Sequence, residues 1–162
     1  MKKKLVILSF YLPGIYPQGE DSVVLNLLAP AYLKAALDSD PKLSEKYETV
    51  ILDITTESSQ EEILKEVDKH NPSIVAYSVY IWNFDQSINS SKLIKKLRPN
   101  VKIIMGGPQV SYDAVSILKA NPQVDVIVKE AGEIIFKTLL STDLSPKDFS
   151  KVAGVAYRDK DK

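Results

Sequence analysis

Short apolar segments alternate with amphipathic stretches along most of the chain. The apolar segments are five or six residues long, rich in β-branched side chains, and several are apolar at consecutive positions. They are Leu5–Ser9, Thr49–Ile54, Ser73–Tyr77, Val101–Met105 and Val124–Val128. Segments of this kind are typical of strands in a parallel sheet that is covered on both faces, so we predict five such strands.

Each of these segments is followed by a stretch with helical periodicity. The predicted helices are Val23–Leu37, Gln60–Lys69, Phe84–Leu97, about Ser111–Lys119 and Glu133–Leu140. Five alternations of strand and helix predict a doubly wound α/β domain of the flavodoxin or Rossmann type, with a five-stranded parallel sheet. Right-handed crossovers would place helices on both faces of that sheet.

The end of the chain departs from this alternation. A loop is expected at Ser141–Ser150, followed by a short sixth strand at Val152–Arg158 and a charged turn. A strand with no return strand favours a longer protein cut at a domain boundary, although a frayed terminus is the alternative. We therefore expect a domain over residues 1–150, with residues 151–162 forming a strand and linker toward a further C-terminal domain.

Composition narrows the possible functions. The chain has 162 residues, 44% of them hydrophobic and 26% charged, which is ordinary for one globular domain. Its 21 basic and 21 acidic residues cancel, which argues against a nucleic-acid partner. The absence of cysteine excludes disulfides, thiolate nucleophiles and cysteine-ligated metal clusters within the chain. The apolar start of about six residues is too short for a signal or membrane segment, so we expect a cytoplasmic protein without a membrane partner.

Ligands of open α/β sheets bind outside the carboxyl ends of the strands. The residues at those ends here are the loop Phe10–Ser22, then Ser78–Asn83, Gly106–Gln109 and Lys129–Glu133. They include the only tryptophan and five of the six glycines, among them Gly14, Gly106, Gly107 and Gly132. Glycines and aromatic residues gathered at one edge favour a large, flat ligand close to the backbone.

Each of these features also has a purely structural explanation. The Gly106-Gly107-Pro108 sequence could simply be a tight turn from strand to helix. Gly132 and Glu133 could only start a helix, with the carboxylate favoured by the helix dipole.

Familiar catalytic and nucleotide-binding motifs are missing. No G-x-G-x-x-G follows the first strand, no phosphate-binding P-loop is present, and Ser78 stands where a receiver domain would carry an aspartate. The sole histidine, His70, lies at a predicted helix end, where a catalytic triad or a metal site cannot be built around it. These observations predict a binding module without a metal site or catalytic residues of its own.

Several segments taken together resemble the N-terminal cobalamin-binding domain of B12-dependent radical SAM proteins. They are Ser78–Asn83 (SVYIWN), Pro99–Gln109 (PNVKIIMGGPQ), Val124–Glu133 (VDVIVKEAGE) and Ala153–Asp159 (AGVAYRD), in the order that the family shows, with Ala31–Leu37 resembling the family's first helix. The Gly-Glu-Gly-Glu that is usual after the fifth strand is replaced here by Lys129–Glu133.

The resemblance implies a particular way of holding cobalamin. The wider fold carries an Asp-x-His-x-x-Gly after the first strand, whose histidine binds cobalt, and the loop Phe10–Ser22 has no histidine. The resemblance therefore implies cobalamin in a base-off and His-off state. Ser78 would hydrogen-bond the base of the nucleotide tail, Gly106 and Gly107 would let the tail lie against the backbone, and Tyr80, Trp82 and Asn83 would lie beside the corrin ring.

The full set of cofactor-binding residues that the resemblance implies covers three strand ends. It consists of Ser78, Val79, Tyr80, Trp82, Asn83, Gly106, Gly107, Pro108, Gln109, Glu130, Gly132 and Glu133.

The resemblance also implies a partner domain and an absence of turnover by this chain alone. In full-length relatives the next domain in the same chain binds S-adenosylmethionine and a [4Fe–4S] cluster, and the reaction is typically a methyl transfer. The alternatives are a flavodoxin-like or nucleotide(-sugar)-binding module of another two-domain enzyme, and an interaction domain without a ligand. A flavin site would need a phosphate-binding loop rich in Ser, Thr and Gly after the first strand, and residues 11–17 (YLPGIYP) do not form one.

Overall fold

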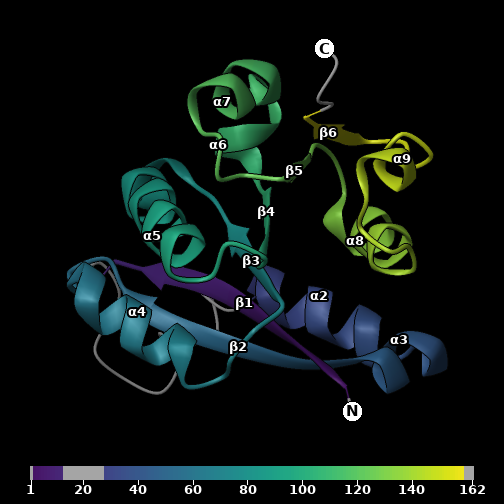
Figure 1. Cartoon of the computed structure of the whole chain (residues 1–162), viewed down its shortest axis with the longest axis horizontal. Coiled ribbons are helices and arrows are strands. Elements are labelled where there is room, and N and C mark those ends of the chain that lie inside the picture. Colours follow the sequence, from purple (N-terminus) through teal and green to yellow (C-terminus); the bar gives the residue numbers. More distant parts are fainter. Residues whose placement is uncertain (1, 13–27, 159–162) are drawn as a thin grey trace.

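The computed structural model describes residues 2–12 and 28–158, and these form one six-stranded sheet flanked by helices (Figure 1). The strand order is β2-β1-β3-β4-β5-β6, with the first five strands parallel and β6 antiparallel to β5. The strands are β1 (Lys3–Tyr11), β2 (Tyr47–Thr55), β3 (Ile74–Ser78), β4 (Lys102–Gly106), β5 (Val126–Val128) and β6 (Val155–Tyr157). The predicted doubly wound α/β fold, with its short extra strand at the C-terminus, is therefore confirmed.

Helices follow the strands largely as predicted. They are α2 (Leu28–Asp38), α3 (Pro41–Lys46), α4 (Gln60–Asp68), η1 (Ile81–Asn83), α5 (Phe84–Leu97), α6 (Pro108–Ser111), α7 (Ala114–Ala120), α8 (Gly132–Leu140) and α9 (Pro146–Phe149). The part of the first predicted helix before Leu28 lies outside the described residues, as do Gly14 and most of the loop after β1.

Two predictions about the helices were wrong. The single helix expected at about 111–119 is divided into α6 and α7, and the loop expected at 141–150 contains α9. In α9 the Ser145 side chain accepts a hydrogen bond from the backbone N–H of Asp148, and Pro146 occupies the first turn. The unpredicted α3 begins in the same way, with Asp40 as the N-cap and Pro41 after it. Such caps stabilise helices too short to show a periodic apolar face.

The direction in which the chain moves across the sheet decides which face each helix covers. The first crossover leads from β1 to β2, whereas the next three lead the opposite way, to β3, β4 and β5. With right-handed crossovers, this reversal places α4, α5 and α7 on one face and α2 on the other, as in Figure 1. The reversal lies between β1 and β3, where ligands of such sheets bind.

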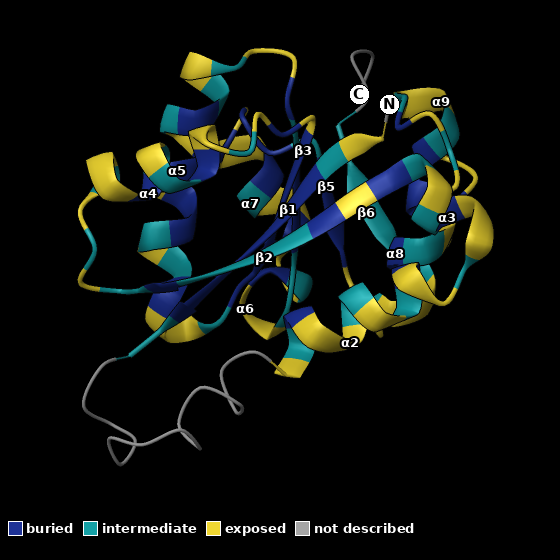
Figure 2. Cartoon of the chain, turned by 90° about the horizontal axis from the view of Figure 1, so that it is seen from below, coloured by how far each residue is buried: buried dark blue, intermediate teal, exposed yellow. Residues whose placement is uncertain are grey.

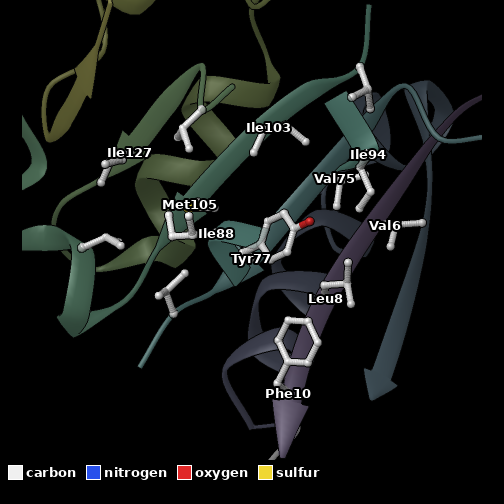
Figure 3. Close-up of a cluster of buried hydrophobic side chains, with 14 of the residues drawn as sticks. Val6, Leu8, Phe10, Val75, Tyr77, Ile88, Ile94, Ile103, Met105 and Ile127 are labelled. Carbon is white, nitrogen blue, oxygen red and sulfur yellow. The ribbon is translucent and has the colours of Figure 1, made fainter. Parts of the chain in front are cut away.

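Both faces of the sheet carry a layer of buried apolar side chains. Figure 2 shows the buried residues in dark blue. The layer under α4, α5 and α7 contains Val6, Tyr77, Met105 and Ile127, several of which are drawn in Figure 3. The other layer lies under α2, α3, α8 and α9 and includes Leu5, Ile7 and Phe136. We call these the α5 face and the α8 face.

The far end of α8 is fixed by residues next to β2. The Lys46 ammonium donates hydrogen bonds to the carbonyls of Leu140 and Thr142, at 3.0 and 2.8 Å, and the Tyr47 hydroxyl donates to Leu140 at 3.1 Å. These bonds occupy carbonyls that the last turn of the helix leaves unpaired. The helix is thereby held in place against the sheet.

The longest helix among the described residues, α5, has 14 residues, and about 20 apolar residues are needed to cross a bilayer. None of the described helices therefore has the length and apolarity of a membrane span.

Candidate functional site

The register of the central strands brings small residues together at the carboxyl edge of the sheet. Ser78 of β3 pairs with Gly106 of β4, and Gly106 pairs with Val128 of β5. Two residues earlier, Ala76 lies between Ile7 and Ile104. Because side chains alternate between the two faces of a strand, these two rows point toward the α8 face. Serine, glycine and alanine leave space there.

A pocket of about 640 Å³, its open mouth included, lies above these two rows. Its floor is the sheet, and its walls come from α2 and α8. It is lined by Ile7, Ala29, Leu33, Ala76, Tyr77, Ser78, Tyr80, Ile104, Gly106, Gly107, Val128, Glu130, Gly132, Glu133 and Phe136. The lining is mostly apolar with a few polar groups at one end, as is usual in small-molecule and cofactor sites.

The two adjacent glycines at the end of β4 have different roles. Gly107 has φ +111°, and a Cβ there would come within 2.4 Å of the Val79 carbonyl oxygen. The fold itself therefore requires glycine at this position. At Gly106 an added Cβ would make only ordinary contacts, the nearest at 3.6 Å from Val128. That Cβ would lie on the same face as Ile104, so it would fill the pocket without disturbing the fold.

The loop after β3 carries a stacked aromatic pair. The rings of Tyr80 and Trp82 are parallel within 7°, with centroids 4.5 Å apart, and Trp82 is 44% exposed. The Asn83 side chain holds this loop: its amide donates to the Ser78 carbonyl at 3.0 Å and its oxygen accepts from the Tyr80 backbone N–H at 2.8 Å. A flat aromatic surface is thus presented to one side of the pocket mouth.

Polar groups of the pocket are gathered toward the carboxyl edge. Ser78 is buried, and none of the described residues hydrogen-bonds its hydroxyl. Glu130 and Glu133 are exposed at the mouth. Further along the same face Asp53 of β2 lies beside Ser9, and burial raises the pKa of its carboxyl to about 6.

A second, more open hollow adjoins the pocket on the other side of Gly107. It is lined by Gly107, Pro108, Ser111, Tyr112, Lys129 and Glu130. Tyr112 is almost fully exposed. Since Gly107 and Glu130 line both hollows, they form one continuous edge.

The structure brings together most of the residues that the sequence singled out. Seven line the pocket: Ser78, Tyr80, Gly106, Gly107, Glu130, Gly132 and Glu133. Pro108 lines the adjoining hollow, and Trp82 stacks on Tyr80.

Three of the predicted residues are placed differently from expectation. Val79 is fully buried and contacts Gly107 through its backbone, and Asn83 is 1% exposed with its amide engaged inside the loop. Gln109 is exposed, lines neither hollow, and meets the loop only through its backbone N–H, 3.4 Å from the Val79 oxygen. Val79 and Asn83 are therefore residues that position the loop and do not lie on its surface.

The sequence analysis missed the apolar walls. Leu33 and Ala29 of α2, Phe136 of α8, and Ile104 and Val128 of the sheet all line the pocket. The strand residues could have been found, because alternation places Ile104 on the face of Gly106. For the helices the sequence gives only an apolar face, with no indication of which part of it borders a cavity.

The only histidine lies far from this site. His70 follows α4 and precedes β3, so it lies at the amino edge of the parallel sheet, opposite the pocket. No cluster of metal-ligating side chains is found in the described ranges, residues 2–12 and 28–158.

Comparison with known proteins identifies this arrangement. A family model described as the B12 binding domain matches residues 31–140, which include β2 to β5, most of α2 and all of α8. The chain belongs to the B12-binding domain family. This match favours cobalamin over the flavodoxin-like alternative, which the same fold would also have allowed.

The relatives of this B12-binding domain agree with the resemblance drawn from the sequence. The cobalamin-dependent radical SAM methyltransferase TokK of Streptomyces tokunonensis is 39% identical over 88 residues, which are 54% of this chain and 13% of the relative. The 2-(S-pantetheinyl)-carbapenam-3-carboxylate methyltransferase of Streptantibioticus cattleyicolor is 28% identical over 145 residues, 89% of this chain and 21% of the relative. The resemblance to B12-dependent radical SAM proteins is confirmed.

A solved structure shares the fold over nearly the whole domain. The cobalamin-dependent radical enzyme OxsB, solved with aqua-cobalamin and S-adenosylmethionine, superimposes with a TM-score of 0.67 at 16% identity, covering 99% of this chain and 21% of OxsB. The chain thus spans about one fifth or less of the length of these three proteins.

Proposed function

We propose that this domain holds cobalamin at the carboxyl edge of the sheet, with the nucleotide tail in the pocket between β3, β4, α2 and α8. The observation that carries the proposal is the row Ser78–Gly106–Val128, which forms an apolar floor with one hydroxyl that no described residue engages. A flat heterocyclic base fits between such a floor and the helices, and Ser78 can donate to its free ring nitrogen.

The corrin ring would then lie over the mouth of the pocket. Tyr80 and Trp82 offer it a stacked aromatic surface, and the hollow lined by Pro108 and Tyr112 gives room for the ring periphery on the other side of Gly107. The carboxylates of Glu130 and Glu133 lie where they can accept hydrogen bonds from amide side chains of the ring.

The state of the cofactor follows from this placement. A tail inserted into the pocket cannot also bind cobalt from below, so the cofactor would be base-off. It would also be His-off, because the chain's only histidine, His70, lies at the amino edge.

We further propose that the domain works within a longer radical SAM enzyme, with the catalytic domain in the same chain. The support is the naming of TokK as a cobalamin-dependent radical SAM methyltransferase and the small share of it that this chain covers. Bound cobalamin would supply a cobalt-carried methyl group. The residues of this domain would bind and orient the cofactor without taking part in bond breaking, since the described lining of the pocket holds no nucleophile with an adjacent base.

The test is retention of hydroxocobalamin through gel filtration, followed by a visible spectrum after reduction to cob(II)alamin. We expect corrin to co-elute with the protein and to show a base-off spectrum. Ser78→Tyr should lower the retained corrin at least tenfold, because the new ring occupies the place of the tail. Ser73→Tyr is the matched control, since Ser73 is exposed just before β3, at the opposite edge.

Two results would contradict the proposal. Equal retention by Ser78→Tyr and the unaltered protein would mean that the tail does not enter this pocket. A base-on spectrum of the retained cofactor would contradict the base-off state while leaving cobalamin binding intact.

A further inference from the structure

The interior of the pocket is uniformly apolar, in contrast to its mouth. Its inner floor is made by Ile7, Ala76 and Ile104, each at most 4% exposed, and its walls by Leu33 and Phe136. The backbone groups of the floor are already paired, since β1, β3 and β4 form a continuous parallel ladder there.

Hydrogen-bonding side chains are confined to the carboxyl end of the pocket. Apart from the Ser78 hydroxyl they belong to Tyr80, Glu130 and Glu133, and both glutamates are exposed. Among the described residues, a ligand that reaches the inner floor therefore meets one hydroxyl on its way in and no polar side chain beyond it.

We infer that this pocket discriminates between corrinoids by the polarity of their lower base, favouring a benzimidazole over a purine. The inference rests on the proposed function, because it concerns the tail that we place in the pocket. It adds the class of corrinoid that the domain accepts.

The chemistry of the two bases gives the expected preference. Dimethylbenzimidazole has one free ring nitrogen once it leaves cobalt, which Ser78 can satisfy, and its remaining edge is carbon. Adenine adds two ring nitrogens and an exocyclic amine, which would face Ala76, Ile104 and Leu33 without partners. Each buried polar group left unsatisfied weakens binding by about tenfold or more.

The test compares three corrinoids by equilibrium dialysis against the 162-residue chain. They are cobalamin, the cobamide with adenine as its lower base, and cobinamide, which lacks the nucleotide tail, all with water as the upper ligand. The two bases differ in how tightly they coordinate cobalt, so each affinity is corrected for the base-on equilibrium of the free cofactor. We expect cobalamin to bind at least tenfold more tightly than the adenine cobamide, and cobinamide to bind more weakly than cobalamin.

The outcomes separate this inference from the proposed function. If cobalamin and the adenine cobamide bind equally while cobinamide binds weakly, the tail occupies the pocket but the selectivity is overturned. If all three bind equally, the tail is not held in the pocket, and both the placement and the selectivity are overturned. If none binds, the proposed function fails and the inference fails with it.

A pair of variants tests the wall directly. Leu33→Gln places an amide on the pocket wall from a half-buried helix position, and it should reduce the preference for cobalamin over the adenine cobamide at least fivefold. Leu64→Gln makes the same change at a half-buried position of α4, on the α5 face, and should leave the preference unchanged. A preference that is the same in both variants and in the unaltered chain would contradict the role given to the wall.

Discussion

The two faces of the sheet share the same strands, yet in the part of the chain that the structure describes the apolar pocket above the strand ends lies on the α8 face. On the α5 face, β3 and β4 end in Tyr77 and Met105, whose large side chains close the core (Figure 3). On the α8 face, the neighbouring positions are Ser78 and Gly106. The backbone and register are common to both faces, so the difference is produced by side-chain volume at alternate positions.

The hydroxyls at the end of β3 also lie in different surroundings on the two faces. Tyr77 on the α5 face is 3% exposed, burial raises the pKa of its phenol, and its oxygen lies 3.3 Å from the Ser90 hydroxyl. Ser78 on the α8 face has no such partner among the described residues. Ser78 can therefore offer its hydroxyl to a ligand in the pocket, whereas the Tyr77 hydroxyl is engaged inside the core.

The largest effect on stability is expected from shortening a large buried side chain on the α5 face. Met105→Ala should lower the free energy of unfolding by about 3 kcal/mol, because a fully buried side chain is lost and the packed neighbours cannot fill the space. Leu33→Ala on the pocket wall should cost only about 1 kcal/mol, since Leu33 is half-buried and already borders a hollow. Urea denaturation of both variants gives the two values.

The same pair should show the opposite order in binding. The folded fraction of Met105→Ala should bind cobalamin with unchanged affinity, whereas Leu33→Ala should bind it more weakly. A Met105→Ala protein that is folded but binds cobalamin poorly would contradict this separation of roles, because it would mean that packing on the α5 face affects binding on the α8 face.

The two glycines at the end of β4 provide a test within the α8 face. Gly107→Ala should lower the free energy of unfolding by about 2 kcal/mol, because φ is +111° and the new Cβ meets the Val79 oxygen. Gly106→Ala should change it by less than about 1 kcal/mol but weaken cobalamin binding, since its Cβ projects into the pocket. Thermal unfolding and dialysis on both variants separate the two roles, and equal stability losses would contradict them.

Most of the fold could be predicted from the sequence, because the spacing of apolar residues and the ends of strands can be read within short segments. Helix α5 has the bounds predicted from its periodicity, and Pro99 ends it as expected. The short helices α3 and α9 were not predicted, because caps stabilise them and each buries a single side chain, Leu43 and Phe149 respectively. A six- or four-residue segment carries too little periodicity to reveal a face.

The candidate site was predictable to a similar degree and for a related reason. Parallel strands end at one edge, so Ser78 and Gly106 could be placed together from the sequence alone. The role of Asn83 could not, because the direction of its amide depends on a loop that closes back on the Ser78 carbonyl. The walls formed by Leu33 and Phe136 depend on how α2 and α8 pack, which no local pattern specifies.

The smallest expected effect concerns Asp53, which lies on the α8 face while its neighbour Ile54 is buried on the α5 face. Burial raises the pKa of Asp53 from the usual 3.8 to about 6 in the folded protein. Because the folded state holds this proton more tightly than the unfolded state, the contribution of Asp53 to stability is greatest below pH 4 and is lost as pH rises through 6. Asparagine cannot ionise, so Asp53→Asn should lose this decline. With allowance for partial exposure to solvent, the variant should gain about 1 kcal/mol over the unaltered protein between pH 4 and pH 7.5.

Urea denaturation of both proteins at pH 4 and pH 7.5 measures this gain. The opposite result is that the free energy of unfolding of Asp53→Asn falls, relative to that of the unaltered chain, between pH 4 and pH 7.5. That result would mean that the folded protein stabilises the ionised carboxylate. The α8 face would then tolerate a charge on its floor near the β2 edge. In that case the apolar character that we use to explain base selectivity would be limited to the part of the floor between β1 and β5.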